Sequence, residues 1–336
     1  MTLRHAQGRA LRQAQDNVPA LVLTAGLATR LRPLSLVRAK AALPVAGTPL
    51  VIRILQWLRD CGITDAVLNL HHLPHTLAGC VGDGSSLDMR VRYSWEVPIL
   101  GSAGGPRRAI PLLLAHESGP RHTFVIVNGD TLTDLDVSAV IDDHRSSGAL
   151  ATLAVVPHTE PDKYGGVLVA ADGAVTGFVP VGSHEPSFHF FGVQVVEAEA
   201  FARVPENMPF ATFGRLYPEL IAERRGSVRA FRCSNTYLDI GTPSDYLTTS
   251  LHLASREGHA TLIGARTRID ESASVDRSIL WDDVVIDADV MLRDCVVTDG
   301  VTVPADTSWH GVSIRKATGE LAPGEKQIDG LAIAPL

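Results

Sequence analysis

Near its C-terminal end the chain repeats apolar residues every six positions, and this period excludes most folds. Two runs hold the period, with a shift of register between Val275 and Ile279: Ile263, Ile269 and Val275, then Ile279, Val285, Met291, Val297, Val303 and Trp309. A six-residue period fits neither an α-helix nor a flat hairpin, and an ordinary edge hairpin would need chance spacing. The period is typical of a triangular β-helix, in which each face takes one hexapeptide whose apolar side chain points inward. We therefore expect a short left-handed β-helix in a C-terminal domain and tail, residues 257–336.

The preceding segment alternates short apolar runs with stretches of helical spacing. Buried strands are predicted within 18–26, 63–71, 89–96, 122–130 and 149–157, and helices within 48–62, 105–118 and 237–257. A hairpin is expected over 163–182, with its turn at Asp172 and Gly173. Strands that alternate with helices predict crossover connections and a Rossmann-like, mostly parallel α/β sheet. This domain should span residues 18–256, after a polar N-terminal arm at 1–17.

Composition limits the classes of function. The formal charge is -7 and 45% of the residues are hydrophobic, which disfavours both a broad cationic face for nucleic acid and extended disorder. Four cysteines are widely spaced, without a CxxC pair, and this disfavours a disulfide framework or a structural zinc site. The sequence lacks a signal-peptide-like start and any apolar run of roughly eighteen residues. We expect a cytoplasmic protein without nucleic-acid or membrane partners.

The segment 21–50 carries the clearest chemical pattern. It is a strand, then a turn of small residues, then the sequence Thr29-Arg30-Leu31-Arg32-Pro33, which offers backbone N–H donors beside cationic side chains. Such a combination suits a polyphosphate. Lys40 follows in an otherwise uncharged stretch, where a ligand contact and an ordinary solvated lysine are both possible. The segment matches neither the P-loop nor the dinucleotide-binding glycine pattern.

This segment resembles the signature of the sugar-1-phosphate nucleotidylyltransferases (NDP-sugar pyrophosphorylases), LxAGxGTRLRPLTxxxPKPLxPVxGxPLI. Four more segments resemble motifs of that family in the same order: Leu100-Gly101-Ser102-Ala103-Gly104, Asn128-Gly129-Asp130, Tyr164-Gly165 and Asp239-Ile240-Gly241-Thr242-Pro243. A hexapeptide tail also occurs in many members. The resemblance covers about residues 18–312 and is nearest to mannose-1-phosphate guanylyltransferase-like proteins.

The resemblance implies transfer of a nucleotidyl group from an NTP to a sugar 1-phosphate, with GTP and mannose 1-phosphate as the expected pair and dTTP or UTP with glucose 1-phosphate close behind. Arg30, Lys40 and Asp130 would be catalytic, and Asp130 and Asp239 would hold Mg²⁺. The sugar would border Lys163, Gly165 and Gly192. A homo-oligomer assembled through the C-terminal domain is also implied. The nucleotide would contact Leu23, Ala25, Gly26, Leu27, Ala28, Thr29, Arg30, Gly104 and Asp130.

Three departures from the family pattern affect these expectations. Ala28 replaces the second loop glycine, and alanines at 39 and 41 replace the prolines that flank the signature lysine. Val181 occupies the place of the lysine that normally meets the sugar phosphate, which Lys163 or Arg215 could replace. The loss of that lysine leaves open a second hypothesis, a catalytically impaired relative that binds an NDP-sugar and regulates or scaffolds a partner. Asp130 as a turn cap, and Asp239 as a helix cap, are the structural alternatives for the two acids.

Overall fold

The computed structural model describes residues 18–115, 122–256, 258 and 261–336. The predicted N-terminal arm, 1–17, and the end of the helix expected over 105–118 lie outside the described residues. The described chain forms two compact units. The first unit contains residues 18–26, 54–72, 81–115 and 122–237, and the second contains 27–53, 73–80, 238–256, 258 and 261–336.

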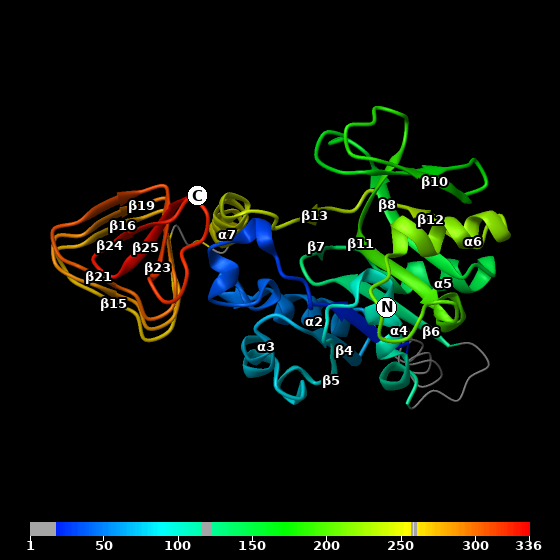
Figure 1. Cartoon of the computed structure of the whole chain (residues 1–336), viewed down its shortest axis with the longest axis horizontal. Coiled ribbons are helices and arrows are strands. Elements are labelled where there is room, and N and C mark those ends of the chain that lie inside the picture. Colours follow the sequence, from blue (N-terminus) through cyan, green and yellow to red (C-terminus); the bar gives the residue numbers. More distant parts are fainter. Residues whose placement is uncertain (1–17, 116–121, 257, 259–260) are drawn as a thin grey trace, which may run out of the picture. The chain divides into compact units, whose positions relative to one another are not determined.

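A nine-stranded sheet forms the centre of the first unit (Figure 1). Its strands are β1 (Ala20–Leu23), β4 (Asp65–Leu70), β5 (Arg90–Trp95), β6 (Thr123–Asn128), β8 (Ala151–Pro157), β9 (Gly166–Val169), β10 (Val175–Val179), β11 (Phe188–Glu197) and β12 (Val228–Arg232). The order is β10-β9-β11-β6-β1-β4-β5, with β8 paired to β11 and β12. Parallel pairs join β1 to β4 and β6, β4 to β5, and β8 to β12, while β11 is antiparallel to β6, β8 and β9. The predicted 163–182 hairpin is present as antiparallel β9 and β10.

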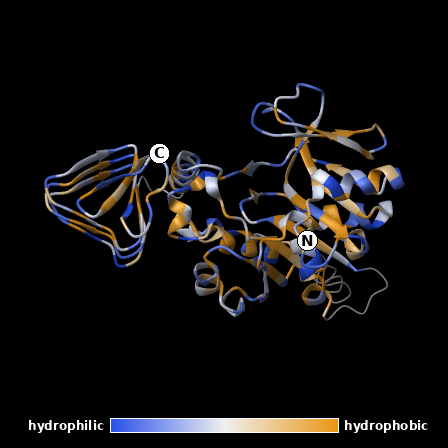
Figure 2. Cartoon of the chain, viewed as in Figure 1, coloured by the Kyte–Doolittle hydropathy of each residue, from blue (hydrophilic) through white to orange (hydrophobic). Residues whose placement is uncertain are grey.

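Helices cover both faces of this sheet. On one face, α4 (Gly101–Leu113) and α6 (Tyr217–Glu223) pack against a core that includes Leu21, Ile126 and Leu153. On the other face lies α5 (Val137–Ser147), whose His144 shares a 2.8 Å hydrogen bond with Thr152, the neighbour of Leu153 on β8. Figure 2 shows hydrophobic residues concentrated on the strands between these helices. This arrangement explains why the strands read as continuous apolar runs.

Shorter elements complete the first unit and its connections. Helices α2 (Leu50–Asp60) and α3 (Pro74–Val81) begin in the second unit and end in the first. Other short elements are the 3-10 helices η4 (Ser85–Leu87) and η5 (Ala198–Phe201), the π-helix η6 (Thr212–Leu216), and the short strands β7 (Leu132–Thr133) and β13 (Tyr237–Leu238). None of the helices in the described part combines the length and apolarity that a membrane span requires.

The predicted β-helix is present in the second unit. Its strands are β14 (Leu262–Ile263), β15 (Arg268–Ile269), β16 (Ser274–Asp276), β17 (Ile279–Leu280), β18 (Val285–Ile286), β19 (Met291–Arg293), β20 (Val296–Val297), β21 (Thr302–Val303), β22 (Ser308–His310) and β23 (Val312–Lys316). They form three parallel ladders, β14-β17-β20-β23, β15-β18-β21 and β16-β19-β22 (Figure 1). Antiparallel strands β25 (Leu331–Pro335) and β24 (Lys326–Ile328) extend the first ladder beyond β23.

Each coil of the β-helix is one residue shorter than the sequence period predicts. Residues on neighbouring coils pair at a separation of 17, as Ile263 does with Leu280. Three hexapeptides would need one residue more, so the register shift recurs in every coil. The inward residue of β19 is therefore Leu292, which is 2% exposed, while Met291 is 58% exposed. The predictions that Ile279, Val285 and Met291 point inward are wrong for this reason, since Leu280, Ile286 and Leu292 form the core of the β-helix in their place.

The shortened side of each coil turns through a left-handed residue. Arg277 and Asp294 have φ values of 45° and 50°, and Gly311 at the equivalent place in the next coil has φ 64°. Positive φ also occurs at the other corners, at Asp283 and Asp289, so the short side is distinguished by its length, with five residues from Leu292 to Val297, and not by the handedness of its corner. Two sides of each coil thus follow the six-residue period, and the third side is one residue shorter.

The rest of the second unit carries the signature segment. It contains the short helical turns η1 (Thr29–Leu31), η2 (Leu34–Leu36) and η3 (Lys40–Ala42), the hairpin strands β2 (Pro44–Val45) and β3 (Thr48–Pro49), and helix α7 (Pro243–Arg256). Thr242 caps α7, since its hydroxyl accepts from the Asp245 amide at 3.1 Å and its amide donates to the Asp245 carboxylate at 2.9 Å.

Candidate functional site

The carboxyl ends of β1 and β6 bring the first half of the signature next to Asp130. Leu23 pairs with Asn128, and the Gly129 amide donates to the Leu23 carbonyl at 2.9 Å. A Cβ at Gly129 would lie 2.5 Å from that carbonyl oxygen, so glycine is required for this close approach. Ala25 and Asp130 therefore follow adjacent parallel strands. They lie at the carboxyl ends of the strands, where α/β folds bind ligands.

A buried chain of hydrogen bonds fixes the loop that follows β1. The Asn69 side-chain oxygen accepts from the Thr24 amide at 2.6 Å, and its side-chain nitrogen donates to Glu96 Oε1 at 2.7 Å. The other Glu96 oxygen accepts from the Leu100 amide at 2.8 Å, just before α4. Glu96 is 0% exposed, so its carboxylate is committed to holding these loops together. Sequence reasoning missed Asn69, although a polar residue inside an apolar strand is a usable signal.

Two predicted nucleotide-binding glycines differ in what surrounds them. Gly104 is buried in α4, where a Cβ would lie 2.6 Å from the Met208 carbonyl oxygen, and this packing alone requires glycine. Gly26 is exposed, and a Cβ there would meet no described atom within 4 Å. The protein itself therefore gives no steric reason for glycine at 26, which favours a ligand that approaches its backbone closely.

The predicted sugar-side residue Gly192 lies beside the Asp130 turn. Its φ of 101° is in the region that favours glycine, and a Cβ would collide with the Thr131 hydroxyl. That hydroxyl donates to the Phe191 carbonyl at 2.8 Å. The first unit thus brings together Asp130 and Gly192, which are far apart in the sequence.

Lys163 stands at one end of a cluster of aromatic rings. Its ammonium lies 4.9 Å from the centre of the Tyr164 ring, and Tyr164 lies 4.4 Å from His189 between ring centres. Tyr237 lies 5.1 Å from His189 on the same measure. The buried Nδ1 atoms of His158 and His189 have no hydrogen-bond partner among the described residues. The sequence analysis named Lys163 and missed the histidines and Tyr237.

Burial and nearby positive charge act on His189. Desolvation first, and then the proximity of His158 and Lys163, lower the pKa of His189 to about 4. His189 is therefore neutral at pH 7 and adds no charge to this part of the unit.

Arg30, Lys40 and Asp239 gather in the second unit. The Lys40 ammonium lies 3.8 Å from Asp239 Oδ1, although 199 residues separate them in the chain. A Cβ at Gly241 would lie 3.7 Å from Asp239 Oδ2 and 3.9 Å from Arg30 Nη1, so the guanidinium borders the same loop. Because Thr242 caps α7, the alternative that Asp239 is the helix cap is wrong. The same Cβ at Gly241 would lie 3.1 Å from Asp245 Oδ2, so two cations and two carboxylates share a small, partly exposed region.

Ala28 occupies a backbone conformation that usually selects glycine. Its φ and ψ are 47° and 48°, directly before η1. The Ser35 hydroxyl donates to the Ala28 carbonyl at 2.9 Å and fixes this turn. Ala28 therefore meets the conformational demand of the missing glycine, at a cost of about 1 kcal/mol. Leu27 and Thr29, the predicted contacts on either side, are solvent-exposed.

The proposed metal ligands are compatible with a hard divalent cation. Within the described residues, no group of three or more His, Cys, Asp or Glu side chains could hold a metal ion by itself. Mg²⁺, however, is commonly bound by one or two carboxylates together with substrate phosphates. The Asp239 side chain is 23% exposed and lies beside a cation, so it can offer charged oxygen donors to such an ion.

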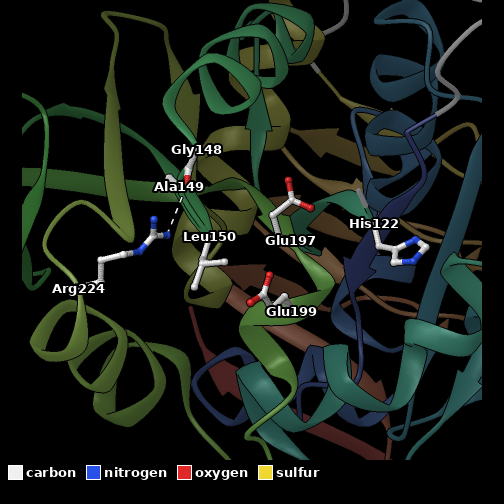
Figure 3. A pocket seen from close by; sticks show the side chains of 7 residues that line it. All are labelled: His122, Gly148, Ala149, Leu150, Glu197, Glu199 and Arg224. Atoms are coloured by element: carbon white, nitrogen blue, oxygen red, sulfur yellow. Dashed lines mark hydrogen bonds between the residues drawn. The ribbon is translucent and has the colours of Figure 1, made fainter. Parts of the chain in front are cut away.

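A pocket elsewhere in the first unit contains none of the predicted site residues. It has a volume of about 390 Å³ and is lined by His122, Gly148, Ala149, Leu150, Glu197, Glu199 and Arg224 (Figure 3). Two glutamates in its wall disfavour a polyphosphate ligand. Arg224 is already engaged, since it donates to the Gly148 carbonyl at 3.3 Å.

Comparisons with known proteins agree with this organisation. The family model described as nucleotidyl transferase matches residues 19–256, and one described as GlmU-like, C-terminal hexapeptide matches 252–313. The chain is 26% identical to mannose-1-phosphate guanylyltransferase of Mycobacterium tuberculosis, over 83% of this chain and 84% of that protein. It is 27% identical to UTP--glucose-1-phosphate uridylyltransferase of Synechocystis, over 93% and 86%.

A solved structure supports the fold. HddC from Yersinia pseudotuberculosis, in complex with GMP-PN, matches with a TM-score of 0.60 at 21% identity, over 70% of this chain and 99% of that chain. With the sheet and the β-helix described above, these matches confirm the predicted fold class and the predicted family. The chain belongs to the nucleotidyl transferase family and carries a C-terminal hexapeptide-repeat domain.

Proposed function

We propose that this protein transfers a nucleotidyl group from an NTP to a sugar 1-phosphate and releases pyrophosphate. The observation that carries the proposal is that two cationic residues, Arg30 and Lys40, lie near Asp239. Both cations belong to the segment after β1, whereas Asp239 follows β13. Residues 18–256 would form the nucleotidyltransferase domain, and 257–336 the C-terminal domain. By similarity to the relatives, GTP with mannose 1-phosphate is the first candidate pair, and UTP with glucose 1-phosphate the second.

The chemistry requires positive charge more than a base. The sugar phosphate oxygen is already anionic near neutral pH, so it can attack the α-phosphorus without losing a proton. The barrier comes from repulsion between two polyanions, which fixed cations reduce. Arg30 would bind the departing phosphates, and Lys40 would neutralise charge near the reacting phosphorus. The exposed backbone at Gly26 would allow close approach of the nucleotide.

A divalent metal ion is generally used by this family, and we assign Mg²⁺ here to Asp130 and Asp239. When bound, the ion would neutralise phosphate charge and help to orient the phosphates. Asp130 follows β6 directly, and its position is fixed by the Gly129 contact with β1. Asp239 would offer a carboxylate oxygen to the ion, with the Lys40 ammonium 3.8 Å from its Oδ1.

On the sugar side, Lys163 is the best candidate to replace the lysine lost at 181. The Gly182 amide donates to the Pro161 carbonyl at 2.8 Å, so the loops that carry Lys163 and Val181 are bonded to each other. Val181 is 57% exposed, so a side chain from a neighbouring loop can reach the place that the family's lysine would occupy. The Tyr164 and His189 rings would then border the sugar, with Gly165 and Gly192 allowing it to approach the backbone.

The proposal is tested by pyrophosphate release with a panel of NTPs and sugar 1-phosphates in the presence of Mg²⁺. We expect turnover with at least one pair, and a loss of about a hundredfold or more in kcat/KM for Lys40→Met or Arg30→Met. Lys326→Met, which removes an exposed lysine of β24, is the matched control and should leave activity unchanged. Binding of an NDP-sugar without turnover of any pair would favour the impaired relative and overturn the enzyme proposal.

We also propose a homo-oligomer formed through the C-terminal domain. The β-helix leaves large apolar side chains exposed, Ile263 and Met291 at 58% each. Exposed apolar side chains of this size are compatible with a contact between copies.

A further inference from the structure

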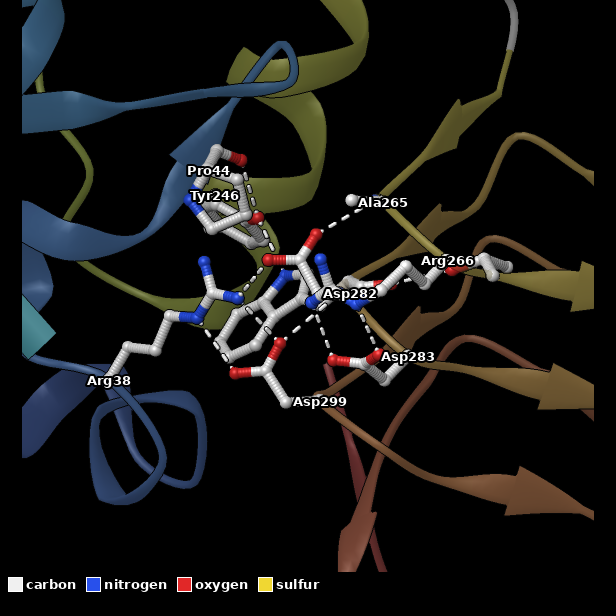
Figure 4. Close-up of polar contacts among 10 residues, drawn as sticks. Arg38, Pro44, Tyr246, Ala265, Arg266, Asp282, Asp283 and Asp299 are labelled. Atoms are coloured by element: carbon white, nitrogen blue, oxygen red, sulfur yellow. Dashed lines mark hydrogen bonds and ion pairs between the residues drawn. The ribbon is translucent and has the colours of Figure 1, made fainter. Parts of the chain in front are cut away.

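The loop that carries Lys40 is fixed on both sides by contacts to the β-helix and to α7, all within the second unit. The upstream anchor is Arg38. Its Nε donates to Asp299 Oδ2 at 2.7 Å, and its Nη2 donates to Asp299 Oδ1 at 2.6 Å and to Asp282 Oδ2 at 2.7 Å (Figure 4). Only 18% of the Arg38 side chain is exposed. A forked guanidinium bound by two carboxylates in this way has little freedom to move.

The two aspartates are built into one corner of the β-helix. Asp282 and Asp299 occupy the same place in successive coils. Each carboxylate also accepts from the amide of the preceding coil: Asp282 from Ala265 at 2.8 Å, and Asp299 from Asp282 at 3.1 Å. Arg38 therefore binds carboxylates that the β-helix backbone already holds in place, so the anchor is rigid.

The downstream anchor is Pro44, which follows η3. The Tyr246 hydroxyl of α7 donates to the Pro44 carbonyl at 2.7 Å and accepts from the Trp281 indole N–H at 2.9 Å (Figure 4). Trp281 and Tyr246 are 1% and 0% exposed. Burial raises the pKa of Tyr246, which keeps the proton that this contact requires.

Trp281 links the two anchors. The Arg38 guanidinium carbon lies 5.3 Å from the centre of its ring, and the same side chain bonds to Tyr246. Lys40 lies between the anchored residues 38 and 44. The prolines that flank this lysine in the family pattern are alanines here, so local rigidity is lost at 39 and 41.

We propose that the β-helix corner formed by Trp281, Asp282 and Asp299 is a positioning element for Lys40, acting through Arg38 and Tyr246. The corner supplies from a distance the rigidity that flanking prolines supply locally. This inference rests on the proposed function, since it assigns a role to the loop that carries a proposed catalytic lysine. It gives the C-terminal domain a task within one chain, separate from self-association.

The test compares Arg38→Met and Tyr246→Phe with Arg277→Met in the full-length protein. Arg277 forms an exposed ion pair with Asp294 on the same β-helix and is the matched control. Arg38→Met and Tyr246→Phe should each lower kcat by about tenfold to a hundredfold with KM nearly unchanged, because misplacing one group affects the transition state more than binding. Arg38→Lys should retain more of kcat than Arg38→Met.

A second readout does not depend on activity. Hydrogen–deuterium exchange of peptides covering residues 34–45 should be faster in both variants than in the wild type and in Arg277→Met. Unchanged exchange in both variants would overturn the proposal, as would accelerated exchange with an unaltered kcat. If the wild type turns over no substrate pair, the proposed function fails, while faster exchange still supports the anchoring itself.

Discussion

At the scale of single residues, the signature loop tolerates a departure from the family pattern because backbone geometry is retained. Ala28 adopts the left-handed conformation that a glycine would take, and Ser35 holds its carbonyl. Gly26 and Gly192 differ in their surroundings, since a Cβ would meet nothing within 4 Å at Gly26 and would collide with the Thr131 hydroxyl at Gly192. A residue type in a motif is therefore explained only by its surroundings.

Because valine replaces the sugar-side lysine at position 181, we predict that Lys163 supplies the positive charge that the sugar phosphate needs. Lys163→Met should raise KM for the sugar 1-phosphate and lower kcat, with a total loss of about a hundredfold in kcat/KM. Adding Val181→Lys should restore at least part of that loss, because the two positions lie on hydrogen-bonded loops. Steady-state kinetics of the single and double variants measure both effects. A Lys163→Met variant with wild-type kinetics would remove Lys163 from the site.

His189 predicts a pH dependence of stability. Its folded-state pKa of about 4 lies below the ordinary value near 6.5, so between these values the unfolded chain binds more protons than the folded one. This group's contribution is complete above pH 6.5 and falls as the pH drops, by up to about 1.4 kcal/mol per pH unit, until about pH 4.

Urea unfolding at several values between pH 7.5 and 4.5 checks this slope. His189→Phe retains a buried ring without the titration, so its free energy of unfolding should fall less steeply over the same range. The exposed His252 offers a matched control, and His252→Gln should follow the wild type. Parallel slopes for the wild type and His189→Phe would contradict the prediction.

At the scale of elements, the β-helix shows how a period can predict a fold and misplace its residues. Runs of six identified the architecture, but each coil contains 17 residues because one side of the coil, the one that turns at Asp294, has five residues. Leu292 therefore faces inward where Met291 was expected. Corner conformation depends on stacking between coils, which a single run of sequence does not reveal.

If the β-helix positions Lys40 through Arg38, a proline beside Lys40 should partly compensate for the loss of that anchor. Ala39 has φ −55°, which suits proline, although Ala39→Pro gives up the hydrogen bond that the Ala39 amide donates to Thr76 Oγ1 at 3.1 Å. In an Arg38→Met background the substitution should recover kcat by about two- to fivefold, because proline reduces the freedom of the loop. The same change in the wild type should have a smaller effect. Equal effects in both backgrounds, by single-turnover kinetics, would argue against shared positioning.

At the scale of the whole molecule, the C-terminal domain is expected to mediate self-association. Size-exclusion chromatography with light scattering should give the mass of a dimer or a larger homo-oligomer at micromolar concentration. Arg38→Met should elute as the wild type does, because its contacts lie within one chain. A monomer across the whole concentration range would refute the prediction.

The sequence by itself determined the family and the fold class, while helices α3, α5 and α6 were not predicted. Its signature loop, its strand-end aspartate and its six-residue period are local patterns, and local patterns report backbone periodicity and the chemistry of neighbouring residues. They sufficed to select Arg30, Lys40, Asp130 and Asp239 for testing.

Tertiary structure alone decided which distant polar groups meet. Arg38 bonds to carboxylates 244 and 261 residues away, and Asn69 bonds to Glu96 beneath the loops of the first unit. Such pairs leave no periodic trace, because either partner alone reads as an ordinary surface or strand residue. Burial makes each pair obligatory, since a polar group removed from water must find a partner wherever the fold places one.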